Sequence, residues 1–393
     1  MASSPAIPEN RNAITAEWLR QALTAGAASG LPAIEDVVVK DIGAGVGILA
    51  EILRCHLTYR DDARAAPESV VVKLPSTHRK TLRMGKWQRL YRREYAYYRH
   101  LSRHSPLRSP RLLYGDFEAS SHRFVLVLED LRGMDVFDEI EGASGEHAKR
   151  AIRAAAKLHG HYWNKVDRPP LSGLHDIFAA KYRPLLQIVY LASLVPTLNR
   201  FGDAFSDEMR RLAEAYGPRV ADHIGEAAAG PKTFVHGDFR LDNMFFGPGA
   251  SEDLTLVDWQ ISGLACGLWD VAFLLGSSVS TEVRRQIERE SLEEYHDILC
   301  GMGVNDFTFE ECWRLYREYV LGRLVVAVFL CGGVDLPFDR SRRLAEVSLR
   351  RTLAAIEDLD AAEFLPDRRR LFSFANAFST LSRGAYKAYK AVR

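Results

Sequence analysis

Three oxygen-bearing side chains lie close together in the sequence, between residues 236 and 258. Asp238 and Asn243 belong to the run His236-Gly-Asp-Phe-Arg-Leu-Asp-Asn243, and Asp258 follows fifteen residues after Asn243. Both acids come directly after strand-like apolar runs, so each is expected on a loop at the end of a strand. A carboxylate can orient a hydroxyl nucleophile, and Mg²⁺ prefers carboxylate and amide oxygens. The pattern therefore favours phosphoryl transfer, with Asp238 as the catalytic residue and Asn243 and Asp258 as metal ligands.

The first third of the chain offers groups that could hold the phosphates of a nucleotide. A cluster of three glycines between two strand-like runs can form a loop that covers phosphates: Gly43, Gly45 and Gly47. Lys73 lies in the strand-like run 70–75, and Glu94 lies on the helical stretch that follows. An ammonium that reaches the phosphates, with a carboxylate as its ion-pair partner, is the arrangement that kinases use.

The hydrophobic periodicity divides the chain into a strand-rich first third and a mostly helical remainder. Strands are expected at 37–39, 53–59, 70–75 and 124–128, and helices at 16–23 and 87–101. Beyond residue 145 the spacing is helical at 146–163 and over most of 171–225 and 281–360, with strands only at 233–235 and 254–257. We therefore expect an N-terminal lobe at 1–130 and a C-terminal lobe at 131–393, joined near Glu129–Gly133.

Taken together, these motifs resemble the aminoglycoside phosphotransferase and choline kinase-like superfamily of small-molecule kinases. Within it, the runs 236–246 and 256–260 are similar to the bacterial branch close to ecdysteroid kinase-like phosphotransferases. The resemblance implies a two-lobed α+β fold like that of protein kinases, with an antiparallel sheet in a small N-lobe and a larger helical C-lobe. It implies ATP and Mg²⁺ as cofactors and a hydroxyl group of a small molecule as the acceptor.

The same resemblance assigns further roles to single residues. The hinge, including Glu129 and Leu131, is expected to bind the nucleotide, mostly through backbone groups. Arg240 stands two residues past Asp238 and could stabilise charge on the transferred phosphate. Asp270 is expected to brace the catalytic loop, which is a structural role.

Three departures from the protein-kinase motifs argue against a protein substrate. Asp258-Trp-Gln260 replaces Asp-Phe-Gly, no Ala-Pro-Glu signature follows it, and Gly237 stands where protein kinases carry arginine. The segment 165–232, where the resemblance places the acceptor pocket, carries eight acids and nine Lys or Arg, so it offers no acidic funnel for a polycation. The apolar run 185–195 favours a neutral or apolar acceptor, either steroid-like or hydroxyacyl.

The composition indicates a cytoplasmic protein without nucleic-acid or membrane partners. The net charge is +1, hydrophobic residues make up 47% of the chain, and the longest apolar run, 324–331, is too short to cross a bilayer. The five cysteines form no C-x-x-C pair, which favours a reducing compartment. The oligomeric state is not indicated.

Two other functions and one surface feature stay open at this level. The run Asp41–Gly47 is also typical of an S-adenosylmethionine-dependent methyltransferase, provided that a helix follows it. A nucleotide-binding scaffold with a kinase fold and no turnover is the other alternative. Between His78 and Arg111 there are eleven Lys or Arg and one acid, which is either a solvated helix face or an anion site.

Overall fold

The computed structural model describes residues 5–26, 32–42, 50–60, 66–249 and 251–367. The chain divides into two compact units, one formed by residues 1–135 with 245–262 and the other by 136–244 with 263–393. The segment 245–262 thus returns to the first unit, although it lies far along the sequence. The lobe limits of 1–130 and 131–393 stay a prediction.

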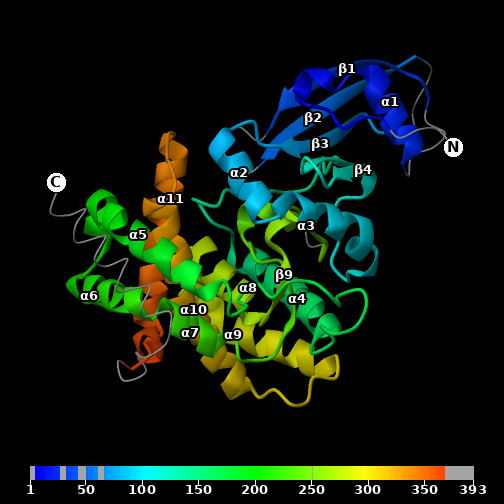
Figure 1. The fold of residues 1–393 in the computed structure, drawn as a ribbon. Helices are drawn as coiled ribbons and strands as arrows, with labels where there is room; N and C mark the ends of the chain where they lie inside the picture. The colour runs from blue at the N-terminus through cyan, green and yellow to red at the C-terminus, as the bar shows by residue number, and fades with distance from the viewer. Residues whose placement is uncertain (1–4, 27–31, 43–49, 61–65, 250, 368–393) are drawn as a thin grey trace. The chain divides into compact units, whose positions relative to one another are not determined.

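The first unit is built on a five-stranded antiparallel sheet with the strand order β1-β2-β3-β5-β4 (Figure 1). Its strands are β1 (Ile34–Asp41), β2 (Ala50–Tyr59), β3 (Ser69–Pro75), β4 (Leu112–Glu118) and β5 (Arg123–Glu129). The β-branched run of β3 suits this central position, and Lys73 pairs in register with Ile52 of β2 and Leu126 of β5. The sequence did not reveal β4, because Gly115 and Asp116 interrupt its apolar pattern.

Helix α1 (Ala16–Ala25) covers one face of this sheet. It begins where the side chain of Thr15 accepts a hydrogen bond from the backbone of Trp18, which is an N-cap. Trp18, Leu19 and Leu23 are buried in the core that α1 shares with β1 and β4. The position of this helix in the sequence was predicted correctly.

The helix expected at 87–101 is instead a series of shorter pieces. These are α2 (Arg79–Trp87), α3 (Leu90–Ala96), a π-helical turn at Tyr97–Leu101 and a 3₁₀ turn at Ser102–His104. Arg89 takes the left-handed backbone conformation at φ 57°, and the chain changes direction there. A left-handed residue ends the helical hydrogen-bond pattern, and the apolar periodicity does not reveal it.

The segment that returns to the first unit carries a short hairpin. Strand β7 (Met244–Phe246) pairs with β8 (Leu254–Leu256), and a 3₁₀ turn follows at Trp259–Ile261. Arg108 forms an isolated parallel bridge with Thr255, which ties the hairpin to the chain between α3 and β4.

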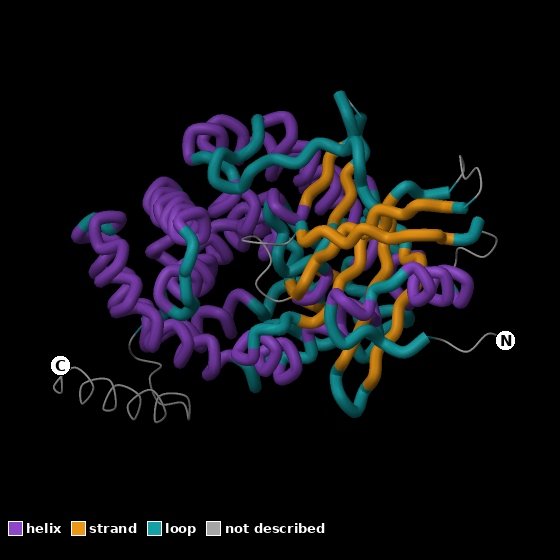
Figure 2. Tube along the Cα trace, turned by 90° about the horizontal axis from the view of Figure 1, so that it is seen from above, coloured by secondary structure: helices purple, strands orange, loops and turns teal. Residues whose placement is uncertain are grey.

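The second unit is mostly helical, as the purple tubes of Figure 2 show. Its helices are α4 (Gly145–Tyr162), α5 (Arg183–Phe201), α6 (Asp207–Tyr216), α7 (Val220–Ala227), α8 (Leu268–Phe273), α9 (Thr281–Gly301), α10 (Phe309–Gly332) and α11 (Asp339–Asp358). Strand β6 (Thr233–Val235) pairs with β9 (Gly263–Ala265).

Helix α10 is the centre of this unit, packed against α5, α8 and α11 (Figure 1). It is apolar on nearly all sides, which is typical of a buried helix. A side chain on Gly332 would place its Cβ 2.0 Å from the backbone oxygen of Ser193, so α10 and α5 can cross this closely only with glycine there. None of the helices in the described part of the chain is long and apolar enough to span a membrane.

Candidate active site

A buried ammonium between two carboxylates is the central feature of the first unit. Lys73 Nζ lies 2.8 Å from Glu94 Oε1 and 2.8 Å from Asp258 Oδ1. The strand β3 supplies the lysine and α3 supplies Glu94, whereas Asp258 follows β8. Three elements that are distant in sequence therefore converge on one charged group.

The charges in this cluster do not cancel. Burial lowers the pKa of Lys73, but Asp258 and Glu94 raise it by more, so the net shift is upward and the ammonium stays charged. Burial raises the pKa of Glu94, and Lys73 offsets only part of this effect. One ammonium facing two carboxylates leaves a formal charge of −1 when both acids are ionised, and a further cation would balance it.

Asp258 is held in a constrained backbone conformation with its carboxylate accessible. Its φ of 65° is in the left-handed region, which non-glycine residues adopt at a cost. Oδ2 accepts a hydrogen bond from Gln260 Nε2 at 3.1 Å. The next residue, Trp259, is fully buried and stacks on Tyr97 with ring centres 3.9 Å apart. The stacked rings fix the position of the turn that carries Asp258. Tryptophan can therefore occupy the position directly after this acid.

The second unit presents the other part of the predicted site, the loop 236–243. Its start is fixed by Asp270 of α8, whose carboxylate accepts the backbone N–H groups of His236 at 2.7 Å and Gly237 at 2.9 Å. Gly237 has a φ of 85°, a conformation that favours glycine. Trp269 Nε1 also donates to the Gly237 oxygen. Asp270 thus lies where the resemblance expects it, beneath the loop.

Three predicted residues meet at the middle of this loop. Asn243 Nδ2 donates to Asp238 Oδ2 at 3.0 Å and to the Asp238 backbone oxygen at 2.9 Å. Arg240 Nε lies 3.3 Å from Asp238 Oδ2, and its Nη1 lies 3.0 Å from Asp242 Oδ2. The carboxylate of Asp238 is about one-fifth exposed, so it is oriented by its neighbours and open to a substrate.

The sequence did not reveal a second layer of contacts that holds this loop from behind. Glu139, which is buried, accepts Ser278 Oγ–H at 2.7 Å and the Asp242 backbone N–H at 3.3 Å. Ser278 Oγ accepts the Leu241 backbone N–H. Arg351 of α11 donates to the backbone oxygens of Glu139, Ile140 and Ser278. No local motif marks these residues, because their partners lie far away in the sequence.

The remaining predicted residues are placed as follows. Glu129 Oε1 accepts from Arg108 Nη2, its Oε2 accepts the Arg111 backbone N–H, and the side chain of Leu131 is buried. Gly43, Gly45 and Gly47 lie outside the described residues. The structure thus brings Lys73, Glu94 and Asp258 together in one unit and the catalytic-loop residues in the other.

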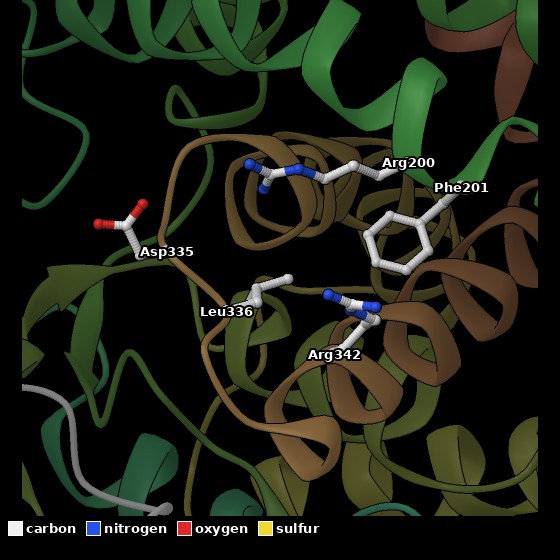
Figure 3. Close-up of a pocket in the computed structure, with 5 residues that line it drawn as sticks. All are labelled: Arg200, Phe201, Asp335, Leu336 and Arg342. Atoms are coloured by element: carbon white, nitrogen blue, oxygen red, sulfur yellow. The ribbon is translucent and has the colours of Figure 1, made fainter.

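A pocket of about 340 Å³ opens elsewhere in the second unit, at the end of α5 and the start of α11. Figure 3 shows its lining, which consists of Arg200, Phe201, Asp335, Leu336 and Arg342. Arg200 Nη1 donates to the backbone oxygen of Cys331 at 3.1 Å. None of the lining residues is one that the sequence marks for chemistry.

Each unit, taken by itself, offers an oxygen donor of the kind that a magnesium ion prefers. Asn243 donates through Nδ2 to Asp238, which leaves its amide oxygen as the atom available to a cation. Asp258 is about one-quarter exposed and belongs to a cluster with surplus negative charge. Hard oxygen donors of this kind suit Mg²⁺ better than a soft metal.

Comparison with known proteins agrees with this chemistry. Residues 57–302, more than half of the chain, match the phosphotransferase enzyme family. The chain therefore belongs to that family. The prediction of a small-molecule kinase is confirmed, as is the resemblance to the aminoglycoside phosphotransferase and choline kinase-like superfamily. The bacterial branch stays a prediction.

Solved structures confirm the fold. A microcompartment-associated aminopropanol kinase superposes with a TM-score of 0.53 at 15% identity, covering 88% of this chain and 98% of the other. A chain from Ralstonia eutropha JMP134, provisionally classed as an aminoglycoside phosphotransferase, superposes with a TM-score of 0.51 at 11% identity, covering 89% and 98%. The predicted two-lobed, kinase-like α+β fold is correct.

Curated relatives match over a shorter stretch. The chain is 51% identical over 113 residues to the mouse acyl-CoA dehydrogenase family member 10, which is 25% of this chain and 10% of the mouse protein. It is 31% identical over 81 residues to the Gallus gallus acyl-CoA dehydrogenase family member 11, which is 18% and 10%. The match thus spans about a tenth of the length of these relatives.

Proposed function

We propose that the protein transfers the γ-phosphate of ATP, with Mg²⁺, to a hydroxyl group of a hydroxyacyl small molecule. The observation that carries the proposal is the buried Lys73 ammonium held between Glu94 and Asp258. An ammonium fixed by a helix carboxylate, beside an acid on a constrained turn, is the arrangement that positions nucleotide phosphates in kinases.

In this proposal the chain's own residues have separate tasks. Asp238 orients the acceptor hydroxyl and takes its proton as the oxygen attacks the γ-phosphorus. The new O–P bond forms while the bond from that phosphorus to the bridging oxygen breaks, and ADP leaves. Arg240 faces the charge that develops on the transferred group. Asn243 and Asp258 hold the magnesium, which neutralises the phosphate oxygens when it is bound.

The nucleotide base is proposed to lie against the hinge at Glu129 and Leu131. Backbone groups would recognise it, since the Glu129 carboxylate is engaged by Arg108 and by the Arg111 backbone N–H. The glycines at 43, 45 and 47 are proposed to cover the phosphates.

The hydroxyacyl acceptor is favoured over the steroid-like one by the curated relatives. Both belong by name to acyl-CoA dehydrogenase families, which points towards acyl chemistry. The balanced charge of 165–232 already disfavours a polycationic antibiotic.

The methyltransferase alternative does not fit the fold. Its motif requires a helix after the glycines, whereas the chain continues into β2, which pairs antiparallel with β1. An activity assay tests the other alternative, a nucleotide-binding scaffold without turnover.

The decisive experiment is the variant Asp238→Asn. We expect a loss in kcat of roughly 10²–10⁴-fold, the usual contribution of a positioned base. The thermal shift that ATP with Mg²⁺ produces should be retained, because the nucleotide contacts lie on other residues. Asp306→Asn, at an exposed position, is the control and should be fully active. An Asp238→Asn protein with normal turnover, or a wild type that binds ATP but phosphorylates no alcohol, would contradict the proposal.

A further inference from the structure

Helix α10 carries a buried arginine, Arg323, whose guanidinium lacks hydrogen-bond partners among the described residues. Arg323 is about 1% exposed, and its guanidinium carbon lies 3.3 Å from the ring centre of Phe273 and 4.9 Å from that of Trp269. Its Nε and Nη1 atoms are buried without a hydrogen-bond partner. Within the described part of the chain, nothing forms an ion pair or hydrogen bond with it.

Other buried arginines of the same unit are paired. Arg284, equally buried, binds the carboxylates of Glu288 and Asp358. Arg351 donates to three backbone oxygens. A buried charged donor without a partner is expensive, and cation–π contacts with two rings return only part of that cost. The exception at Arg323 therefore suggests that its partner is a ligand.

Trp269 connects this cation to the catalytic loop, because its ring centre lies 4.9 Å from the Arg323 guanidinium carbon and its Nε1 donates to the Gly237 backbone oxygen at 3.1 Å. Burial lowers the pKa of Arg323 to about 9, while the carboxylates of Asp238, Glu139 and Asp270 raise it. The guanidinium is therefore charged at neutral pH and within electrostatic reach of Asp238. Arg240 adds a second positive charge at the same carboxylate.

We propose that Arg323 binds an acyl oxygen of the acceptor while Asp238 orients the acceptor's hydroxyl group. The oxygen belongs either to the carboxylate of a free hydroxy acid or to the carbonyl of a hydroxyacyl thioester. Guanidinium donors match both, and the carboxylate would form the stronger, charge-assisted bond. The inference rests on the proposed function and adds to it the residue that sets acceptor specificity.

We expect this arrangement to distinguish acceptors by the free energy that it costs to leave the Arg323 donors without a hydrogen-bond partner. An alcohol without an acyl oxygen would leave the Arg323 donors unsatisfied, and sites with buried polar groups reject such analogues strongly. A cationic acceptor would in addition be repelled by Arg323 and Arg240.

The test compares three sets of acceptors on the full-length protein with ATP and Mg²⁺. They are hydroxyhexanoic acids with the hydroxyl on carbon 3, 4 or 5, the coenzyme A thioesters of these acids, and the matching hexanols without an acyl group. The position series finds the spacing between hydroxyl and acyl oxygen that the site accepts, and the first two sets distinguish the two sources of the oxygen.

The variant Arg323→Met removes the donors and keeps an apolar side chain between the rings. We expect KM for the best acyl acceptor to rise roughly 30-fold or more, the loss typical of removing one partner of a buried charged hydrogen bond. KM for ATP should stay within about twofold of wild type, the preference for acyl acceptors over hexanols should fall, and Arg323→Lys should recover part of that preference.

Stability supplies an independent readout. Without acceptor, Arg323→Met should melt at or above the wild-type temperature because it removes an unpaired buried charge. Arg284→Met should melt lower, since Glu288 loses its ion pair with Arg284 and Asp358 keeps only its ion pair with Arg285.

The possible results distinguish the specificity role of Arg323 from the proposed kinase activity. If wild type phosphorylates hexanols as well as acyl acceptors, or if Arg323→Met impairs every acceptor equally, the specificity role is wrong and the kinase stands. If wild type phosphorylates no acceptor in any set, both the specificity role and the proposed function fail.

Discussion

At the scale of single residues, Lys73 stabilises the carboxylate form of Glu94, although burial still raises the pKa of Glu94 to about 7. We predict that Lys73→Met destabilises the protein by about 3–5 kcal/mol, because it leaves a buried charge without its partner. Adding Glu94→Gln should restore most of that loss, since the fully buried carboxylate is then gone and Asp258, which also loses its partner, is about one-quarter exposed. Urea unfolding of the two single variants and the double variant measures the coupling.

A lysine on the edge strand β1 of the same sheet supplies the control. Lys40 of β1 is exposed, so Lys40→Met should change stability by no more than about 0.5 kcal/mol. Equal effects at positions 40 and 73, or no rescue in the double variant, would mean that the ion pair does not support the fold.

The sequence could predict the residues of this cluster because each belongs to a motif with its own spacing. The run of valines located Lys73 in a strand, and the helical pattern put Glu94 on the next helix. The sequence could not predict Arg323 as a lone buried cation. Its position in an apolar helix is visible, but the absence of a partner depends on the packing of α8 against α10.

At the scale of elements, helix α11 supports the catalytic loop through one side chain. Arg351 donates to three backbone oxygens of the segments that carry Glu139 and Ser278, and these two side chains hold the loop. Long-range contacts of this kind have no local sequence signal. For the same reason β7 and β9 were not foreseen, since each is defined by its pairing with another strand.

We predict that Arg351→Met costs about 2–4 kcal/mol of stability, because removing the donor leaves buried oxygens unsatisfied at ~1–3 kcal/mol each. It should also lower kcat about tenfold with little change in KM for ATP, since the loop loses its support while the nucleotide contacts are intact. Arg350 is the matched control on the same helix. It is exposed and pairs with Glu346 and Asp203, so Arg350→Met should be close to neutral.

Unfolding and steady-state kinetics of both variants decide the question. An Arg351→Met protein with wild-type kcat would show that the loop holds its geometry without α11. A loss of the same size in both variants would show that the effect belongs to the helix as a whole.

At the scale of the whole molecule, the net charge of +1 favours no nucleic-acid partner, yet individual buried groups make stability depend on pH. His223 of α7 is fully buried and lies 2.8 Å from Tyr216 Oη through its Nδ1. Burial lowers its pKa to about 3, whereas the ordinary value is 6.5. Composition cannot reveal this dependence, because it arises from where one of twelve histidines is placed.

The direction of this pH dependence follows from the number of protons that the folded and unfolded chains bind. Between pH 6.5 and 3 the unfolded chain carries a proton on His223 and the folded chain does not, so acidification favours unfolding. Stability from this group is fully present above pH 6.5 and falls as the pH decreases, by at most about 1.4 kcal/mol per unit.

We predict that His223→Gln, which keeps a polar group for Tyr216, flattens this slope between pH 6.5 and 4. His122→Gln, at an only partly buried turn, should keep the wild-type slope. Urea unfolding at several pH values measures the three slopes, and identical slopes in wild type and His223→Gln would mean that His223 is already protonated in the folded protein.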